Sequence, residues 1–256
     1  MKYNKLTLGI AVVVIILIVI ITLYYFSLRR PEIDDVWYIN LDRDTERNEH
    51  YKSQAHLFGA PVTRFAGTYG RDVNREEARE KYGICTSLTR SNNNDENNSN
   101  HNILHIPGVM GCWISHKRLL THLNTLSLPS HYGHLITEDD LIVPPDFRAR
   151  WSAIRQNVPC DWDIVYLYTG ETHGEPIAPN ILRWKNDKAT ANFGTVAYLV
   201  RHGALPKMLA ELRFMDSAID NQFYRRFGHL KLYIVHPSLI TTGEMESSLA
   251  AINHGK

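Results

Sequence analysis

The chain has 256 residues, of which 44% are hydrophobic and 21% charged, and its formal net charge is +1. The first thirty residues hold four positive charges and no acid, so residues 31–256 are near −3, which argues against a nucleic-acid-binding surface. The cysteines are too few for a disulfide framework and lack the spacing of a zinc site; they are Cys85, Cys112 and Cys160.

Residues 6–28 form an uncharged apolar stretch of 23 residues. As a helix this stretch would span roughly 34 Å, enough to cross a bilayer. The aromatic residues at 24–26 suit the level of the lipid headgroups, and two arginines follow at 29–30. A cleaved signal peptide is the alternative, but it would have a shorter apolar region that ends at small residues. We therefore predict a signal-anchor helix at 6–28 after a short flank at 1–5, with positive charges too evenly divided to fix its orientation.

After the anchor, segments typical of strands alternate with segments typical of helices. Strands are predicted at 36–41, 134–137, 163–168, 195–200 and 232–235, and helices at 45–58, 71–82, 109–123, 203–213 and 217–227. This alternation predicts an α/β domain with a largely parallel sheet over residues 31–256. The Asn-rich stretch 91–102 has no apolar residue to bury, so we predict a disordered loop there, with a glycosylation sequon at 97–99.

The acidic triplet Glu138-Asp139-Asp140 follows the apolar segment 134–137. It is predicted to lie at the carboxyl edge of the sheet, which is where ligands bind in open α/β sheets. Carboxylates at such an edge need a compensating charge, and a divalent cation held together with substrate phosphates supplies one. Glu138 and Asp140 have the acidic-x-acidic spacing that sugar-nucleotide transferases use for this purpose. A solvated acidic loop would have the same sequence, so the triplet alone leaves both interpretations open.

Further blocks follow one another in a distinctive order. They are Trp37-Tyr-Ile-Asn-Leu-Asp-Arg43 with Arg47, Gly108-Val-Met-Gly-Cys-Trp-Ile-Ser-His116, Leu135-Ile-Thr-Glu-Asp-Asp140, Trp162-Asp-Ile-Val-Tyr-Leu167, Gly194-Thr-Val-Ala-Tyr198 with Gly203-Ala204, then Asp220 and the tail 237–248. Together they resemble glycosyltransferase family 25, which includes bacterial lipooligosaccharide galactosyltransferases and animal procollagen galactosyltransferases. The resemblance covers most of 33–248. Thr137 in place of a leucine and the Asn-rich insertion depart from the family pattern, but neither touches a presumed ligand.

The resemblance implies a GT-A-like nucleotide-sugar transferase fold and a metal-dependent, inverting transfer of a hexose, galactose or glucose, from a UDP-sugar. Mn²⁺ or Mg²⁺ at Glu138 and Asp140 would stabilise the charge that grows on the diphosphate. The acceptor hydroxyl needs a base at the moment of attack, and Asp220 is the candidate. Without the resemblance, Asp220 would be interpreted as a helix cap or a salt-bridge partner. The implied acceptor is a glycan, a glycolipid or a hydroxylysine-type group.

Four polar residues after the first strand are candidates for nucleotide binding: Asn40, Asp42, Arg43 and Arg47. The arginines could contact the diphosphate through paired donors. Alternatively, the acids cap the following helix and the arginines face solvent. The sequence supports both interpretations equally.

The remaining candidates also have both a ligand-binding and a structural interpretation. Ser115 and His116 could contact the donor sugar, although a lone histidine on an apolar helix face is usually a core residue. Asp139 is grouped with the nucleotide-binding residues, and His236 is a candidate metal ligand or phosphate contact at the end of the last strand. Cys112 lies four residues before His116, but nothing in the sequence orients the pair, so a thiol hydrolase is not predicted.

Two other functional classes remain open at this point. A glycoside hydrolase would use paired carboxylates, Glu138 with Asp220 or Glu171, and would need neither nucleotide sugar nor metal. The second class is a non-catalytic, membrane-anchored binding protein of the same fold. The presence of Glu138, Asp140 and Asp220 together argues against this class. The anchor predicts a single-pass membrane protein whose catalytic domain lies in a secretory lumen or at a membrane surface.

Overall fold

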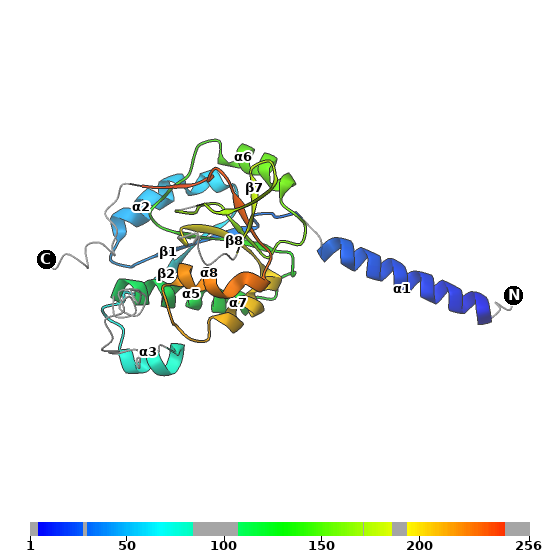
Figure 1. The fold of residues 1–256 in the computed structure, drawn as a ribbon, viewed down its shortest axis with the longest axis horizontal. Coiled ribbons are helices and arrows are strands. Elements are labelled where there is room, and N and C mark those ends of the chain that lie inside the picture. The colour runs from blue at the N-terminus through cyan, green and yellow to red at the C-terminus, as the bar shows by residue number, and fades with distance from the viewer. Residues whose placement is uncertain (1–4, 28–29, 84–106, 171, 186–193, 244–256) are drawn as a thin grey trace.

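The computed structural model describes residues 5–27, 30–83, 107–170, 172–185 and 194–243. Its body is an α/β domain in which one mixed sheet is covered on both faces (Figure 1). The sheet contains β1 (Asp35–Asn40), β2 (Val62–Ala66), β3 (Gly133–Glu138), β5 (Ile164–Tyr166), β6 (Gly174–Ala178), β7 (Ile181–Trp184), β8 (Ala197–Arg201) and β9 (Leu232–Val235). The main helices are α2 (Thr45–Gln54), α3 (Arg75–Tyr82), α5 (Pro107–Asn124), α6 (Phe147–Ile154), α7 (Leu205–Glu211) and α8 (Ile219–Arg226).

The strand order is β2-β1-β3-β8-β5-β9-β7-β6. Within the described chain, all of these strands run in the same direction except β8 and β7. The predicted α/β class with a mostly parallel sheet is therefore confirmed. Because β8 is reversed, its beginning lies at the edge where β1, β3 and β5 end. This edge gathers residues that are far apart in the sequence.

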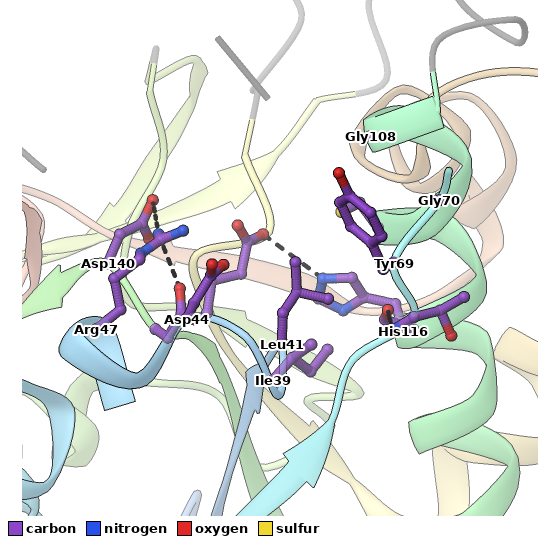
Figure 2. Close-up of a pocket in the computed structure, with 14 residues that line it drawn as sticks. Ile39, Leu41, Asp44, Arg47, Tyr69, Gly70, Gly108, His116 and Asp140 are labelled. Atoms are coloured by element: carbon purple, nitrogen blue, oxygen red, sulfur yellow. Dashed lines mark hydrogen bonds and ion pairs between the residues drawn. The ribbon is translucent and has the colours of Figure 1, made fainter. Parts of the chain in front are cut away.

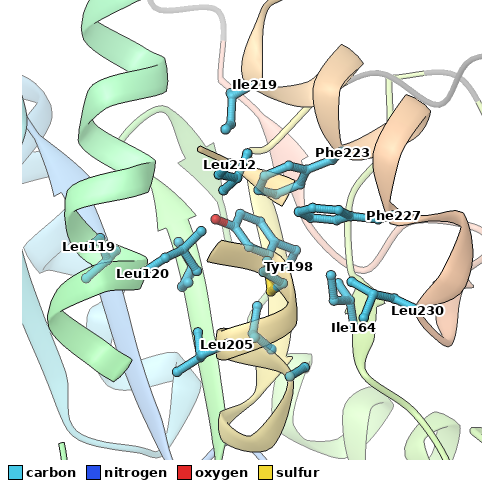
Figure 3. Close-up of a cluster of buried hydrophobic side chains, with 14 of the residues drawn as sticks. Leu119, Leu120, Ile164, Tyr198, Leu205, Leu212, Ile219, Phe223, Phe227 and Leu230 are labelled. Atoms are coloured by element: carbon cyan, nitrogen blue, oxygen red, sulfur yellow. The ribbon is translucent and has the colours of Figure 1, made fainter. Parts of the chain in front are cut away.

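Two hydrophobic cores hold the layers together, one on each face of the sheet. The first packs α5, α7 and α8 against the sheet and includes Tyr198, whose ring lies among leucine and phenylalanine side chains (Figure 3). The second lies under α2 and α6 and includes Tyr51 and Trp151. Strand β8 is buried at all but its last residue because both faces are covered. This explains why its sequence is a continuous apolar run.

The chain returns to the acidic triplet after the last strand of the sheet. β10 (Thr241–Thr242) pairs with β4 (Leu141–Ile142), and the Gly243 N–H donates to the Asp140 carbonyl at 2.7 Å. The end of the described chain therefore lies beside Asp140. The predicted strands and helices after the anchor are all present, with ends shifted by a few residues.

The sequence did not predict β2, the β6–β7 hairpin or α6. The Asn-rich stretch 91–102 and Glu171 lie outside the described residues.

The predicted anchor coincides with helix α1 (Lys5–Ser27), which projects from the α/β body (Figure 1). Its side chains are described at 9–22, and large apolar ones from Ile10 to Ile21 are about half exposed. Within the part of the chain that the structure describes, no helix has the length and apolarity needed to span a membrane.

Candidate functional site

The acidic triplet lines a pocket at the carboxyl edge of the sheet, as its position after a buried strand predicts (Figure 2). Glu138 ends β3, and Asp139 and Asp140 follow it. Other walls come from the turn between β1 and α2, from the segment 68–70 after β2, and from the start of α5. The pocket therefore exists because parallel strands deliver their following loops to one edge.

Arg47 binds two of the three carboxylates. Its Nη2 atom lies 2.8 Å from Asp139 Oδ1 and 2.9 Å from Asp140 Oδ2. Asn40, which is 2% exposed, donates from Nδ2 to Asp139 Oδ2 at 2.7 Å and accepts from Arg64 Nε at 2.8 Å. Asn40 therefore orients Asp139, and its predicted contact with a nucleotide stays a prediction.

The pocket has more negative than positive charge. Among the described residues that line it, Asp44 joins the triplet as a fourth acid, and Arg47 is the arginine that faces them. Burial raises the pKa of Asp139 to about 6, although Arg47 and Asn40 act against this rise. Burial and the charge of Glu138 also raise the pKa of Asp140. Burial therefore makes the charged forms of both aspartates costly, even with Arg47 beside them.

Glu138 faces a different set of partners. Its Oε1 accepts from Thr195 Oγ1 at 2.6 Å and lies 3.5 Å from His116 Nε2. Burial favours a higher pKa for Glu138, but His116, Thr195 and Arg47 together outweigh it and hold the pKa below its usual value. On the other side of the imidazole, His116 Nδ1 is 2.8 Å from the Tyr198 hydroxyl. Glu138 therefore remains a carboxylate in the pocket.

The segment 67–70 is held tightly against the first turns of α5. A Cβ atom on Gly111 would lie 2.5 Å from the Thr68 carbonyl oxygen, so only glycine allows this approach. The Thr68 N–H donates to Ser115 Oγ at 2.8 Å, and Ser115 Oγ donates to the Gly111 carbonyl at 2.6 Å. Ser115 lines the pocket, but its hydroxyl mainly fixes the pocket wall. Gly108, in the first turn of α5, also lines the pocket, so a helix N-terminus with its partial positive charge lies at the pocket.

Asp220 lies next to this site without lining the pocket. It is in the first turn of α8, where Oδ1 accepts from its neighbour's N–H at 2.7 Å and Oδ2 accepts from the Gly194 N–H at 3.2 Å. Gly194 precedes Thr195, the residue that binds Glu138. Asp220 and Glu138 both raise the pKa of the Cys112 thiol. The structure thus brings Asp220 to the same sheet edge as the triplet.

Three candidates are placed elsewhere. Asp42 is exposed and pairs with Arg64 at 2.6 Å, and Arg43 stacks over the Tyr69 ring at 4.6 Å, so neither lines the pocket. His236 is also exposed, and its N–H donates to the Asn180 carbonyl at 2.9 Å. Strands β8 and β5 separate β9 from β3, a distance of roughly 14 Å at the usual strand spacing. His236 is therefore not brought together with Glu138 and Asp140.

Sequence reasoning did not single out several residues that form the site. Thr195 fixes Glu138, Tyr69 forms a pocket wall, and Asp44 adds a carboxylate. The segment Gly67-Thr-Tyr-Gly70 did carry a signal, since two glycines close together mark a sharp loop. Thr195 carried none, because its role depends on the reversed direction of β8.

The pocket lies at the carboxyl edge of an α/β sheet, which is where ligands bind in open sheets of this class. Comparison with known proteins makes the assignment specific. The profile of the family described as "Glycosyltransferase family 25 (LPS biosynthesis protein)" matches residues 34–223. The chain belongs to glycosyltransferase family 25.

A curated relative from Drosophila pseudoobscura pseudoobscura, named "Glycosyltransferase 25 family member", is 28% identical over 154 residues. This alignment covers 57% of the present chain and 23% of the relative. The family resemblance predicted from the sequence is confirmed, although the tail 237–248 lies beyond the matched range.

Replacing Arg47 with methionine should destabilise the protein. The side chain is 15% exposed, and its loss would leave Asp139 and Asp140 without their counter-charge. Breaking such a buried pair should lower the free energy of unfolding by about 3 kcal/mol, measured by urea denaturation in chelator. Arg43→Met is the matched control, because that side chain is 61% exposed and its pair with Asp44 spans 4.0 Å. Equal losses in the two variants would contradict the role assigned to Arg47.

Proposed function

We propose that this member of family 25 is a membrane-anchored, metal-dependent and inverting glycosyltransferase. It moves a hexose, galactose or glucose, from a UDP-sugar to a glycan, a glycolipid or a hydroxylysine-type acceptor. The single observation that carries the proposal is the excess of carboxylates in the pocket. Asp139 and Asp140 share one arginine, Arg47, while Glu138 lies beside His116, and the pKa values of both aspartates are raised. A divalent cation bound with a diphosphate would supply the missing charge.

The residues present fit a hard divalent cation such as Mn²⁺ or Mg²⁺. Asp140 Oδ1 is buried and has no hydrogen-bond partner among the described residues, so a carboxylate oxygen is available in the pocket. Glu138 lines the same pocket and keeps a lowered pKa. When bound, the cation would stabilise the negative charge that develops on the leaving diphosphate. Glu138 and Asp140 are its proposed ligands, and Arg47 and Asp139 shape the acidic side of the site.

The chain's own groups account for binding and for proton transfer. The N-terminus of α5 and the segment 68–70 offer backbone N–H groups to a phosphate. Asp220 is the proposed base, which takes the proton of the acceptor hydroxyl as the sugar–phosphate bond breaks. Its Oδ2 bond to the Gly194 N–H is long at 3.2 Å, so an acceptor hydroxyl can compete for that oxygen.

The proposed membrane anchor is α1. Its support is the uncharged apolar sequence 6–28 and the exposure of the apolar side chains from Ile10 to Ile21. Exposed apolar surface on this scale needs a covering, and lipid provides one. We place the catalytic domain after the anchor, in a secretory lumen or at a membrane surface.

Asp140→Asn should abolish sugar transfer and leave the fold intact. The substitution removes one proposed ligand charge while keeping the shape of the side chain. Turnover, measured as UDP released from a UDP-hexose with manganese, should fall at least ~100-fold, because the developing charge loses its main stabilisation. Asp146→Asn is the control, since that side chain is 66% exposed and pairs only loosely with Arg150. An active Asp140→Asn enzyme would refute the metal assignment.

The Asp220→Asn variant tests whether Asp220 acts as a base or has only a structural role. The amide keeps an oxygen acceptor for the Gly194 N–H but has no basicity. Nucleotide affinity should stay nearly unchanged while turnover falls by the ~10²–10⁴-fold typical of losing a general base. Asp216→Asn is the control. Asp216 lies four residues before Asp220 and pairs with Arg226, and its replacement should keep most of the activity. If the two variants were equally active, Asp220 would not be the base.

Deleting residues 1–30 should release the protein from membranes and keep its turnover. The proposed site uses only residues that follow the anchor, so the chemistry needs none of the deleted ones. Fractionation of membranes washed with alkaline carbonate, with the full chain as control, measures the release. A shortened protein that stays in the membrane fraction would show that the attachment lies elsewhere.

A further inference from the structure

Three side chains of different chemistry converge on one wall of the pocket. Cys112 and His116 are four residues apart on α5 and therefore share one face of that helix. Glu138 reaches this face from the end of β3. The donor atoms, a thiol sulfur, an imidazole nitrogen and a carboxylate oxygen, all lie within 4.8 Å of one another.

The surroundings of His116 are those of a metal-binding histidine. His116 is 1% exposed, and its Nε2 atom lies 3.5 Å from Glu138 Oε1. Its other nitrogen, Nδ1, is 2.8 Å from the hydroxyl of Tyr198. That hydroxyl lies on the side of the ring that faces α5 (Figure 3). An Nδ1–H that donates to Tyr198 would leave the lone pair of Nε2 directed at Glu138, and metal-binding histidines are commonly held in this way.

We propose that Cys112, His116 and Glu138 form a zinc site whose fourth position opens into the pocket. With usual zinc–ligand distances of about 2.0–2.3 Å, tetrahedral ligand atoms lie about 3.3–3.6 Å apart. The separation of 3.5 Å between His116 Nε2 and Glu138 Oε1 fits this spacing. Three protein ligands with one open position is the arrangement of catalytic zinc sites.

The ligand types select the metal. A thiolate with an imidazole favours zinc over the hard ions Mg²⁺ and Mn²⁺, which prefer oxygen ligands. The site is also distinct from the proposed position at Asp140, since Asp140 turns toward Arg47 and Glu138 turns toward His116. Glu138 is the residue that the two positions share. Cysteine spacing in the sequence did not indicate this site, because only one of its ligands is a cysteine.

Two simpler roles for Cys112 fit less well. A nucleophilic cysteine needs a base free to take its proton, whereas both nitrogens of His116 face other groups, Nδ1 at 2.8 Å from Tyr198 and Nε2 at 3.5 Å from Glu138. A disulfide is not formed, since Cys112 and Cys160 are both unbonded among the described residues. A core histidine explains the contacts of His116 with Tyr198 and Glu138 but gives no role to Cys112, whose sulfur lies within 4.8 Å of the other two ligand atoms. Metal binding accounts for all three side chains at once.

Cobalt titration tests the site without any assay of sugar transfer. The full chain in detergent, stripped with chelator, is titrated with Co²⁺, which takes the place of zinc in tetrahedral sites. We expect a thiolate-to-cobalt charge-transfer band in the near ultraviolet that saturates at one ion per chain and disappears when Zn²⁺ is added. A wild-type protein that shows no such band would overturn the proposal, whatever its transferase activity.

Variants test which residues produce the cobalt charge-transfer band. Cys112→Ser should remove it, whereas Cys160→Ser and Asp140→Asn should keep it. Tyr198→Phe should weaken zinc binding roughly 10- to 100-fold, the usual effect of losing an outer-shell partner. A band that persists in Cys112→Ser, or one lost in Asp140→Asn while the fold is retained, would place the metal elsewhere. Because binding and transfer are measured separately, a cobalt band in an inactive protein would refute the proposed function and leave the zinc site standing.

Discussion

The structure depends on how three adjacent carboxylates are held at the end of one buried strand. Two of them, Asp139 and Asp140, share Arg47, and the third, Glu138, turns to Thr195 and His116. One arginine cannot compensate this charge, and burial makes the deficit costly. The pocket therefore favours a ligand that brings positive charge, and we propose that a cation-bound diphosphate supplies it.

The sheet brings these partners together through one reversed strand. Because β8 runs against β3 and β5, its first residues arrive where the neighbouring strands end. Thr195 thereby reaches Glu138, and Gly194 reaches Asp220. Helix α5 closes the opposite wall, held there by the close contact between Gly111 and Thr68. The acidic triplet, the proposed base and the helix N-terminus at the pocket thus come from separate parts of the chain.

Local sequence patterns predicted the parts of the fold whose apolar runs decide their structure. The apolar run before Glu138 and the helical spacing from Val109 to Leu123 both gave elements close to those observed. The pattern did not predict β2, which is only partly buried and so lacks a clear alternation. Site residues were likewise predicted only where a local sequence pattern placed them. The triplet was found because it follows a strand, whereas Thr195 depends on strand order. His236 was misplaced because the end of a strand does not show which strands lie between.

The most direct test of the central claim is a screen of UDP-galactose and UDP-glucose with the purified full chain, with manganese and with chelator. UDP release is the readout. The account predicts release from one of these donors in manganese and none above background in chelator. Equal release under the two conditions would contradict it, since the excess negative charge of the pocket would then have no part in the reaction.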